Sequence, residues 1–78
     1  MKDFKIVDDE ISGDIHVTSD TQFNSIKAKN LSIAENVNVR LFGTVENVLL
    51  KQGSRLYLHG KIFGDIENDG GEVFTFFE

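Results

Sequence analysis

Residues 30–43 read NLSIAENVNVRLFG, and residues 47–60 repeat this pattern 17 positions later as NVLLKQGSRLYLHG. A third, less similar copy, GDIENDGGEVFTF, occupies residues 64–76. A fixed period of this size indicates that each repeat is one structural unit, which buries its apolar side by stacking on its neighbours. Turn-forming residues recur in step with the period, in one column at Gly13, Asn30, Asn47 and Gly64 and in another at Ser19, Asn36, Gly53 and Gly70.

The same alignment places apolar residues in columns that run through the repeats. These columns are Val39, Leu56 and Val73; Leu41, Leu58 and Thr75; Ile11, Ala28, Val45 and Ile62; Leu31 and Val48; and Ile33 and Leu50. Between the columns, apolar and polar residues alternate, as they do in strands that are buried on one side. We expect corners at Gly and Asn, which adopt left-handed backbone conformations most readily. These corners would divide each lap into short strands of about three to five residues that point in three different directions.

This pattern predicts an all-β fold, a single-stranded parallel β-helix of about four to five 17-residue laps. Such a coil forms hydrogen bonds from lap to lap, with equivalent residues about 4.8 Å apart. We expect residues 11–78 to form the repeat domain and residues 1–10 to form an N-terminal arm or cap. The main competing fold is a β-sandwich of seven short strands. A left-handed hexapeptide helix would need aliphatic residues at every sixth position, which this chain does not sustain.

The 78 residues include no cysteine and no proline. Because proline cannot donate a hydrogen bond to a strand ladder, its absence leaves every segment free to pair. The absence of cysteine excludes disulfides and thiolate metal sites, and it fits a cytoplasmic location. The sequence contains neither the apolar core of a signal peptide nor a run of about 18 apolar residues, so we expect no membrane span.

The net charge of −5 is unevenly distributed along the chain. Residues 1–20 carry −4, residues 21–64 carry +4 and residues 65–78 carry −5. An acidic overall balance argues against binding to a nucleic-acid backbone as the main task.

Four short aliphatic–glycine steps run through the chain: ISGDI at 11–15, LFGTV at 41–45, LHGKI at 58–62 and IFGDI at 62–66. These steps resemble those of bactofilins, the polymer-forming bacterial cytoskeletal proteins, and the similarity covers roughly residues 11–76. The resemblance implies a right-handed parallel β-helix, no nucleotide, no catalytic residues and assembly through the ends of the coil. This chain is shorter, lacks the usual disordered flanks and has strongly acidic terminal laps, all of which disfavour a filament.

If the apolar columns point inward, the residues between them point outward and form two further columns. The first contains Phe23, Arg40, Tyr57 and Phe74, and the second contains Phe42, His59 and Phe76. An outward surface this rich in aromatic residues predicts a protein interface. The alternative is that the inside–outside pattern slips by one residue near the C-terminus, which would place Phe74 and Phe76 in the core.

The sequence offers little catalytic or metal-binding chemistry. His16 and His59 are far apart and belong to different laps, so a shared metal site is disfavoured. Asp8, Asp9 and Glu10 lack the spaced oxygen ligands of a calcium loop. Ser32 and Ser54 have no base nearby in the sequence alignment, so a nucleophile is unsupported. We therefore expect no cofactor, no metal and no enzymatic activity.

Two functions of different classes fit these observations. The first is a non-enzymatic, bactofilin-like assembly module that self-associates. A closed dimer is favoured over a filament because both terminal laps are acidic and would repel each other. The alternative is a small acidic inhibitor or immunity-type protein, which binds and neutralises a basic protein such as a toxin.

Overall fold

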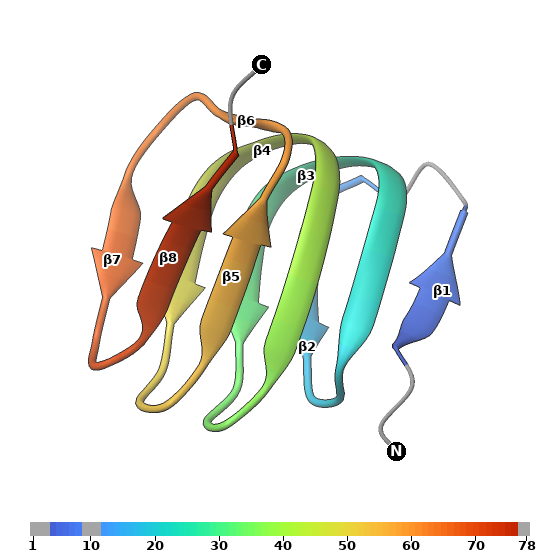
Figure 1. The fold of residues 1–78 in the computed structure, drawn as a ribbon. Coiled ribbons are helices and arrows are strands. Elements are labelled where there is room, and N and C mark those ends of the chain that lie inside the picture. Colours follow the sequence, from blue (N-terminus) through green and yellow to red (C-terminus); the bar gives the residue numbers. More distant parts are fainter. Residues whose placement is uncertain (1–3, 9–11, 77–78) are drawn as a thin grey trace.

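The computed structural model describes residues 4–8 and 12–76, and these residues form one coil of parallel strands (Figure 1). Eight strands make up the coil: β1 (Lys5–Val7), β2 (Asp14–Val17), β3 (Thr21–Ile33), β4 (Asn38–Leu50), β5 (Arg55–Leu58), β6 (Lys61–Ile62), β7 (Ile66–Asn68) and β8 (Glu72–Thr75). Every strand pair among the described residues is parallel. The predicted parallel β-helix is therefore confirmed, with about four turns.

Each lap of the coil has two flat faces joined by a bend. The first face contains β1, the beginnings of β3 and β4, then β5 and β8. The second contains β2, the ends of β3 and β4, then β7, and the bend between the faces includes β6. In Figure 1 the chain rises along the near face, crosses the bend and descends behind while advancing from β1 towards β8, which makes the coil right-handed.

The central laps follow the predicted 17-residue period. Val39 pairs with Leu56 and Leu56 with Val73, while Val45 pairs with Ala28 on one side and Ile62 on the other. The expected member Ile11 of this last column lies outside the described residues. β1 lies within the segment expected to form an arm or cap, and it pairs with the start of β3.

A constant 17-residue repeat is wrong for the outer laps, because the offset between paired residues varies. Asp14, not Gly13, pairs with Asn30, and Ile66 rather than Asp65 pairs with Val48. At the start of β3 the offset grows because Asn24 and Ser25 together face the single residue Phe42, which is a β-bulge. The turn column that contains Gly13 and Gly64 is therefore out of register by one residue at both ends of the coil.

The strands β3 and β4 are 13 residues long, not the three to five predicted. Their backbone pairing continues around the bend, because the bulge in β3 and Gly43 in β4 curve the strands without ending them. The corner expected at Asn30 and Asn47 thus lies inside continuous strands. Between β3 and β4, and between β4 and β5, the strand is interrupted at the corner on the opposite side of the lap.

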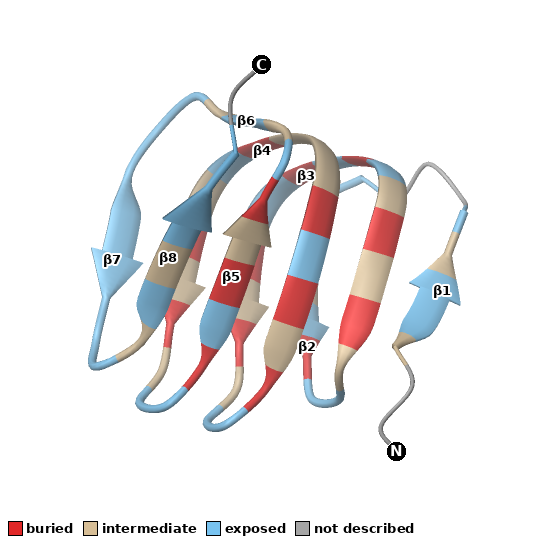
Figure 2. Ribbon diagram, viewed as in Figure 1, coloured by how far each residue is buried: buried red, intermediate tan, exposed pale blue. Residues whose placement is uncertain are grey.

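The hydrophobic core lies between the two faces and consists of the inward-pointing columns (Figure 2). Residues in the middle laps are completely enclosed, and Ile26, Ile33, Val39, Leu41, Leu50 and Leu56 are each 0% exposed. In the last lap the equivalent inward residue Ile66 is 42% exposed, because no further described strand covers it. Burial therefore depends on each lap having a neighbour on both sides.

The corner that joins the second face of one lap to the first face of the next contains stacked residues with a left-handed backbone. Asn36, Gly53 and Gly70 have φ angles of 59°, 76° and 92°, as the second turn column predicted, although Ser19 is not among the described residues with positive φ. The turns also bond to one another, since the amide of Gly53 donates to the carbonyl of Gly70 at 3.0 Å. The buried Ser54 satisfies its own hydroxyl by donating to the carbonyl of Lys51 at 2.6 Å.

Neighbouring laps leave no room for a side chain at Gly43 and Gly60. A Cβ atom placed on Gly60 would collide with the backbone nitrogen, carbon and oxygen of Gly43, and one placed on Gly43 would collide with the backbone of Ile26. Only glycine therefore fits these two positions, and no side chain covers the backbone there.

We expect Gly60→Ala to destabilise the fold much more than Gly13→Ala. Gly60→Ala forces two backbones apart, which costs about 1–3 kcal/mol or more. At Gly13, φ is 89° but nothing lies within 4 Å of an added Cβ, so only the backbone strain of roughly 1–2 kcal/mol applies. Urea unfolding at low protein concentration measures both variants, and equal midpoints would contradict the close approach of the two laps.

Candidate functional site: an aromatic face across the laps

The outer surface of the first face contains two columns of aromatic side chains. Strand pairing places Arg40 beside Tyr57 and Tyr57 beside Phe74 in the first column. The rings of Tyr57 and Phe74 are stacked, with centroids 5.2 Å apart and planes inclined by 15°. Phe74 remains 37% exposed. In-register parallel strands impose this stacking, because equivalent side chains repeat at about the inter-strand distance.

Phe42, His59 and Phe76 form the second column, which we call the aromatic ridge. The His59 ring lies between the two phenylalanine rings, with both centroid distances 4.5 Å and interplanar angles of 11° and 7°. Phe76 also contacts Tyr57 of the first column at 6.5 Å between centroids. The ridge and the first column together are called the aromatic face.

The outward position of Phe74 and Phe76 is confirmed, because Phe76 is 50% exposed. The alternative, a slip of the C-terminal strand that places Phe74 and Phe76 in the core, therefore does not occur. Near the N-terminus the prediction is wrong, since Phe23 is only 3% exposed and belongs to the core. The bulge in β3 shifts the register by one residue, so Phe23 pairs with the inward Leu41, and Gln22 takes the outward position beside Arg40.

The N-terminal side of the aromatic face ends in polar and charged contacts. The guanidinium carbon of Arg40 lies 4.7 Å from the centroid of the Phe4 ring, within the range of a cation–π interaction. Beyond it, the amide of Gln22 donates to Asn24 at 2.9 Å, and Asn24 in turn donates to Asp8. The aromatic rings are therefore concentrated on β4, β5 and β8, while amide groups occupy the earlier laps.

A groove lies directly beside the aromatic ridge. Its lining consists of the ridge itself, Gly43, Gly60, Thr44 and Lys61. The ridge residues Phe42 and His59 precede the glycines in the chain, and Thr44 and Lys61 follow them, so the groove runs along two laps between the ridge and this second wall. We call it the glycine groove, because Gly43 and Gly60 form its floor.

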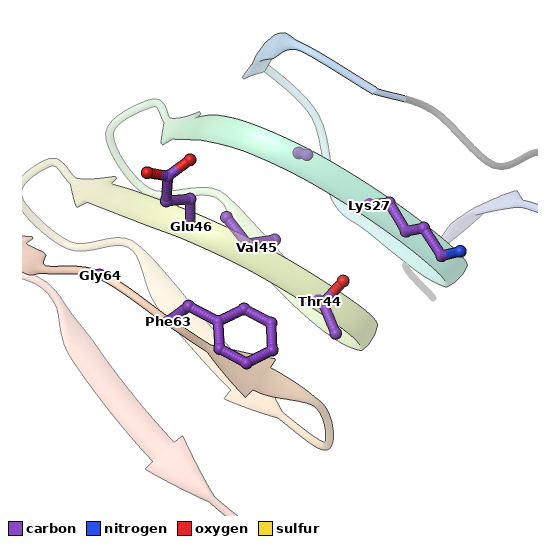
Figure 3. A pocket seen from close by; sticks show the side chains of 7 residues that line it. Lys27, Thr44, Val45, Glu46, Phe63 and Gly64 are labelled. Carbon is purple, nitrogen blue, oxygen red and sulfur yellow. The ribbon is translucent and has the colours of Figure 1, made fainter.

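A second hollow lies farther round the bend, where Figure 3 shows the side chains of Lys27, Thr44, Glu46 and Phe63. The Phe63 ring is 71% exposed, while Val45 at this hollow is buried. The hollow shares Thr44 with the glycine groove. It contains one carboxylate and one ammonium group on different laps, without the converging polar groups of a small-molecule site.

The structure reveals a serine–histidine contact that sequence reasoning missed. Nδ1 of His16 lies 3.1 Å from the hydroxyl oxygen of Ser32 on the second face, so the prediction that Ser32 has no base nearby is wrong. A 16-residue lap brings the two together, whereas a strict 17-residue period places Ile15 beside Ser32. The pair is exposed on an open sheet, and its Ser32 also lines a hollow together with Asn47, Asp65 and Glu67.

Side-chain amides bond along the edge of this second face. Asn47 donates to Asn30 at 3.1 Å and Asn30 donates to Asp14 at 2.8 Å, while the Asn47 oxygen accepts from the backbone amide of Asp65. These groups satisfy one another and leave a surface without converging ligands. Within residues 4–8 and 12–76, no group of three His, Asp or Glu side chains is placed to hold a metal ion.

Comparisons with protein-family models, with curated proteins and with solved structures find no match to this chain. In the part of the chain that the structure describes, no helix is long and apolar enough to cross a membrane.

We expect Phe23→Ala and Phe76→Ala to differ sharply in stability. Removing the buried Phe23 ring should cost about 3–5 kcal/mol, because the core cannot close around the cavity. Removing the half-exposed Phe76 ring should cost about 0.5–1.5 kcal/mol, the worth of one stacked aromatic pair. Denaturant unfolding of both variants tests the corrected register, and similar losses would place Phe23 outside the core.

Proposed function

We propose that this protein is a non-enzymatic assembly module that self-associates through its aromatic face. One observation carries the proposal: two columns of stacked rings cross β4, β5 and β8 on an open surface. The exposed fractions of Phe74 and Phe76 are 37% and 50%. Exposed aromatic surface of this kind is typical of interface cores, where Tyr, Phe and Arg are enriched.

The charge distribution favours contact through this face over contact through the ends of the coil. Asp65, Glu67 and Asp69 are exposed in the last lap, and Asp8 and Asp14 are exposed in the first. End-to-end stacking would bring these two acidic laps together, although salt screens exposed charges over about 8–10 Å. The aromatic rings are flanked by Arg40 and Lys61, and the carboxylate of Glu72 at the start of β8 lies 3.9 Å from Arg55, so a contact between two such faces brings fewer carboxylates together than stacking of the ends.

This proposal extends the hypothesis of a bactofilin-like assembly module, but the contact lies on a side of the coil and not at its ends. The right-handed parallel coil agrees with the fold that the resemblance implies. A closed dimer through a side of the coil replaces the open polymer, because a two-fold contact buries the same surface on both copies and then stops.

We expect the double variant Phe42→Glu with Tyr57→Glu to be monomeric and folded. Two buried carboxylates would oppose the contact, while both positions point away from the core. Size-exclusion chromatography with light scattering over a hundredfold concentration range measures the mass. The control variant Thr18→Glu with Gln52→Glu adds the same charge at exposed turns and should keep the wild-type mass.

Two outcomes would contradict this proposal. A double variant with unchanged oligomeric mass would show that the aromatic face is not the contact. A mass that rises continuously with concentration in the wild-type chain would indicate open end-to-end stacking instead of a closed dimer.

The acidic last lap supports a second candidate, an inhibitor that binds a basic protein. Asp65, Glu67, Asp69 and Glu72 are all exposed, and Arg55 approaches Glu72 only to 3.9 Å between two largely exposed side chains. A pair of this kind contributes little and leaves the carboxylate open to a stronger partner. A wild-type chain that stays monomeric at every concentration would favour this function.

A further inference from the structure

We infer that two copies of this chain pair side by side with their coils parallel, the aromatic ridge of each copy entering the glycine groove of the other. This inference rests on the proposed function and adds the partner surface and its geometry. The occupant of the glycine groove is thus the Phe42–His59–Phe76 ridge of a second copy.

The glycine groove has the form needed to receive a row of rings. Gly43 and Gly60 both line it and carry no side chain, so backbone forms the lining between its two walls. Its far wall is short at Thr44 and long at Lys61, and its near wall is the ridge. The glycines and the ridge both repeat once per lap, so two of the three rings, Phe42 and His59, meet Gly43 and Gly60 at the same spacing.

The ridge and the groove lie side by side on one surface, which makes that surface self-complementary. A two-fold axis parallel to the coil, placed between ridge and groove, exchanges the two features and seats both ridges at once. An axis perpendicular to the coil would instead place ridge against ridge and leave both grooves empty. Shape therefore selects the parallel arrangement, in which each lap faces the equivalent lap of the second copy.

Charge and size agree with this contact. No carboxylate lines the groove or its ridge, Glu67 lies on the opposite face, and Glu72 at the start of β8 lies 3.9 Å from Arg55. The molecule measures 28 × 28 × 25 Å, so one whole face is comparable to the roughly 800 Å² that each partner contributes to a standard interface. The contact must therefore use most of the aromatic face and not a single ring.

Distances between spin labels distinguish the parallel dimer from an antiparallel one. The chain has no cysteine, so single substitutions Lys29→Cys, Glu46→Cys and Phe63→Cys give unique labels. These three exposed positions lie one lap apart in the same outward column, beyond the far wall of the groove. Pulsed electron paramagnetic resonance then measures each label-to-label distance within the dimer.

In the parallel dimer the three distances should agree within the width of the label distributions, because the separation from a parallel axis does not change along the coil. In an antiparallel dimer the axial separation would change by about 10 Å from one position to the next, which is twice the lap spacing. Three unequal distances of this kind, measured in a dimer, would overturn the inference while leaving the proposed function intact. A wild-type chain without any dimer would overturn both.

Filling the groove provides an independent test with a matched control. We expect Thr44→Trp to raise the dissociation constant of the dimer about tenfold or more, because the indole would occupy the space of the incoming ridge. Glu46→Trp adds the same ring on the same strand, two residues away and outside the groove, and should leave the constant unchanged. Light scattering on a dilution series measures both, and equal constants would also overturn the inference.

Discussion

Hydrogen bonding between each lap and the next, in register, is the constraint on which the rest of this structure depends. The bonds join the corners as well as the strands, since the amide of Asn36 donates to the carbonyl of Gln52 at 3.2 Å and that of Gly53 donates to the carbonyl of Gly70 at 3.0 Å. One registered backbone therefore stacks every residue on its counterpart. Inside the coil the result is the fully enclosed core, and outside it is the pair of ring columns.

The sequence predicts the fold well in the middle laps, because there the period is constant and turn residues mark it. It fails where an extra residue enters a strand without a sequence signal. The bulge at Asn24 and Ser25 is made of ordinary polar residues, so nothing in the pattern shows that Phe23 turns inward. The missed contact between His16 and Ser32 has the same cause, since a lap shortened by one residue changes which side chains are neighbours. Successive side chains of a strand point to opposite faces. Each shift by one residue therefore exchanges the inward-pointing and outward-pointing side chains.

The aromatic face was predictable in its C-terminal part for the same physical reason. Arg40, Tyr57 and Phe74, and likewise Phe42, His59 and Phe76, lie in laps that keep the 17-residue offset. What the sequence could not show is the groove beside the ridge. The repeat places Gly43 and Gly60 in one column, but a groove also depends on how the side chains on either side of the column are arranged in space, which the residue pattern does not give.

The stacked rings and the glycines beside them have opposite effects on the stability of the coil. Stacked rings stabilise neighbouring laps by about 0.5–1.5 kcal/mol per pair, so each aromatic column strengthens the coil even without a partner. Glycine contributes no such contact, and it costs conformational entropy in a strand. Ring stacking therefore does not explain why glycine occupies positions 43 and 60, beside the aromatic ridge. The close packing of the two laps requires the glycines, and the groove that they line repeats with the laps, as the ridge beside it does. A surface that carries both a ridge and its complement can be satisfied by a copy of itself, and the acidic ends of the coil then remain in water.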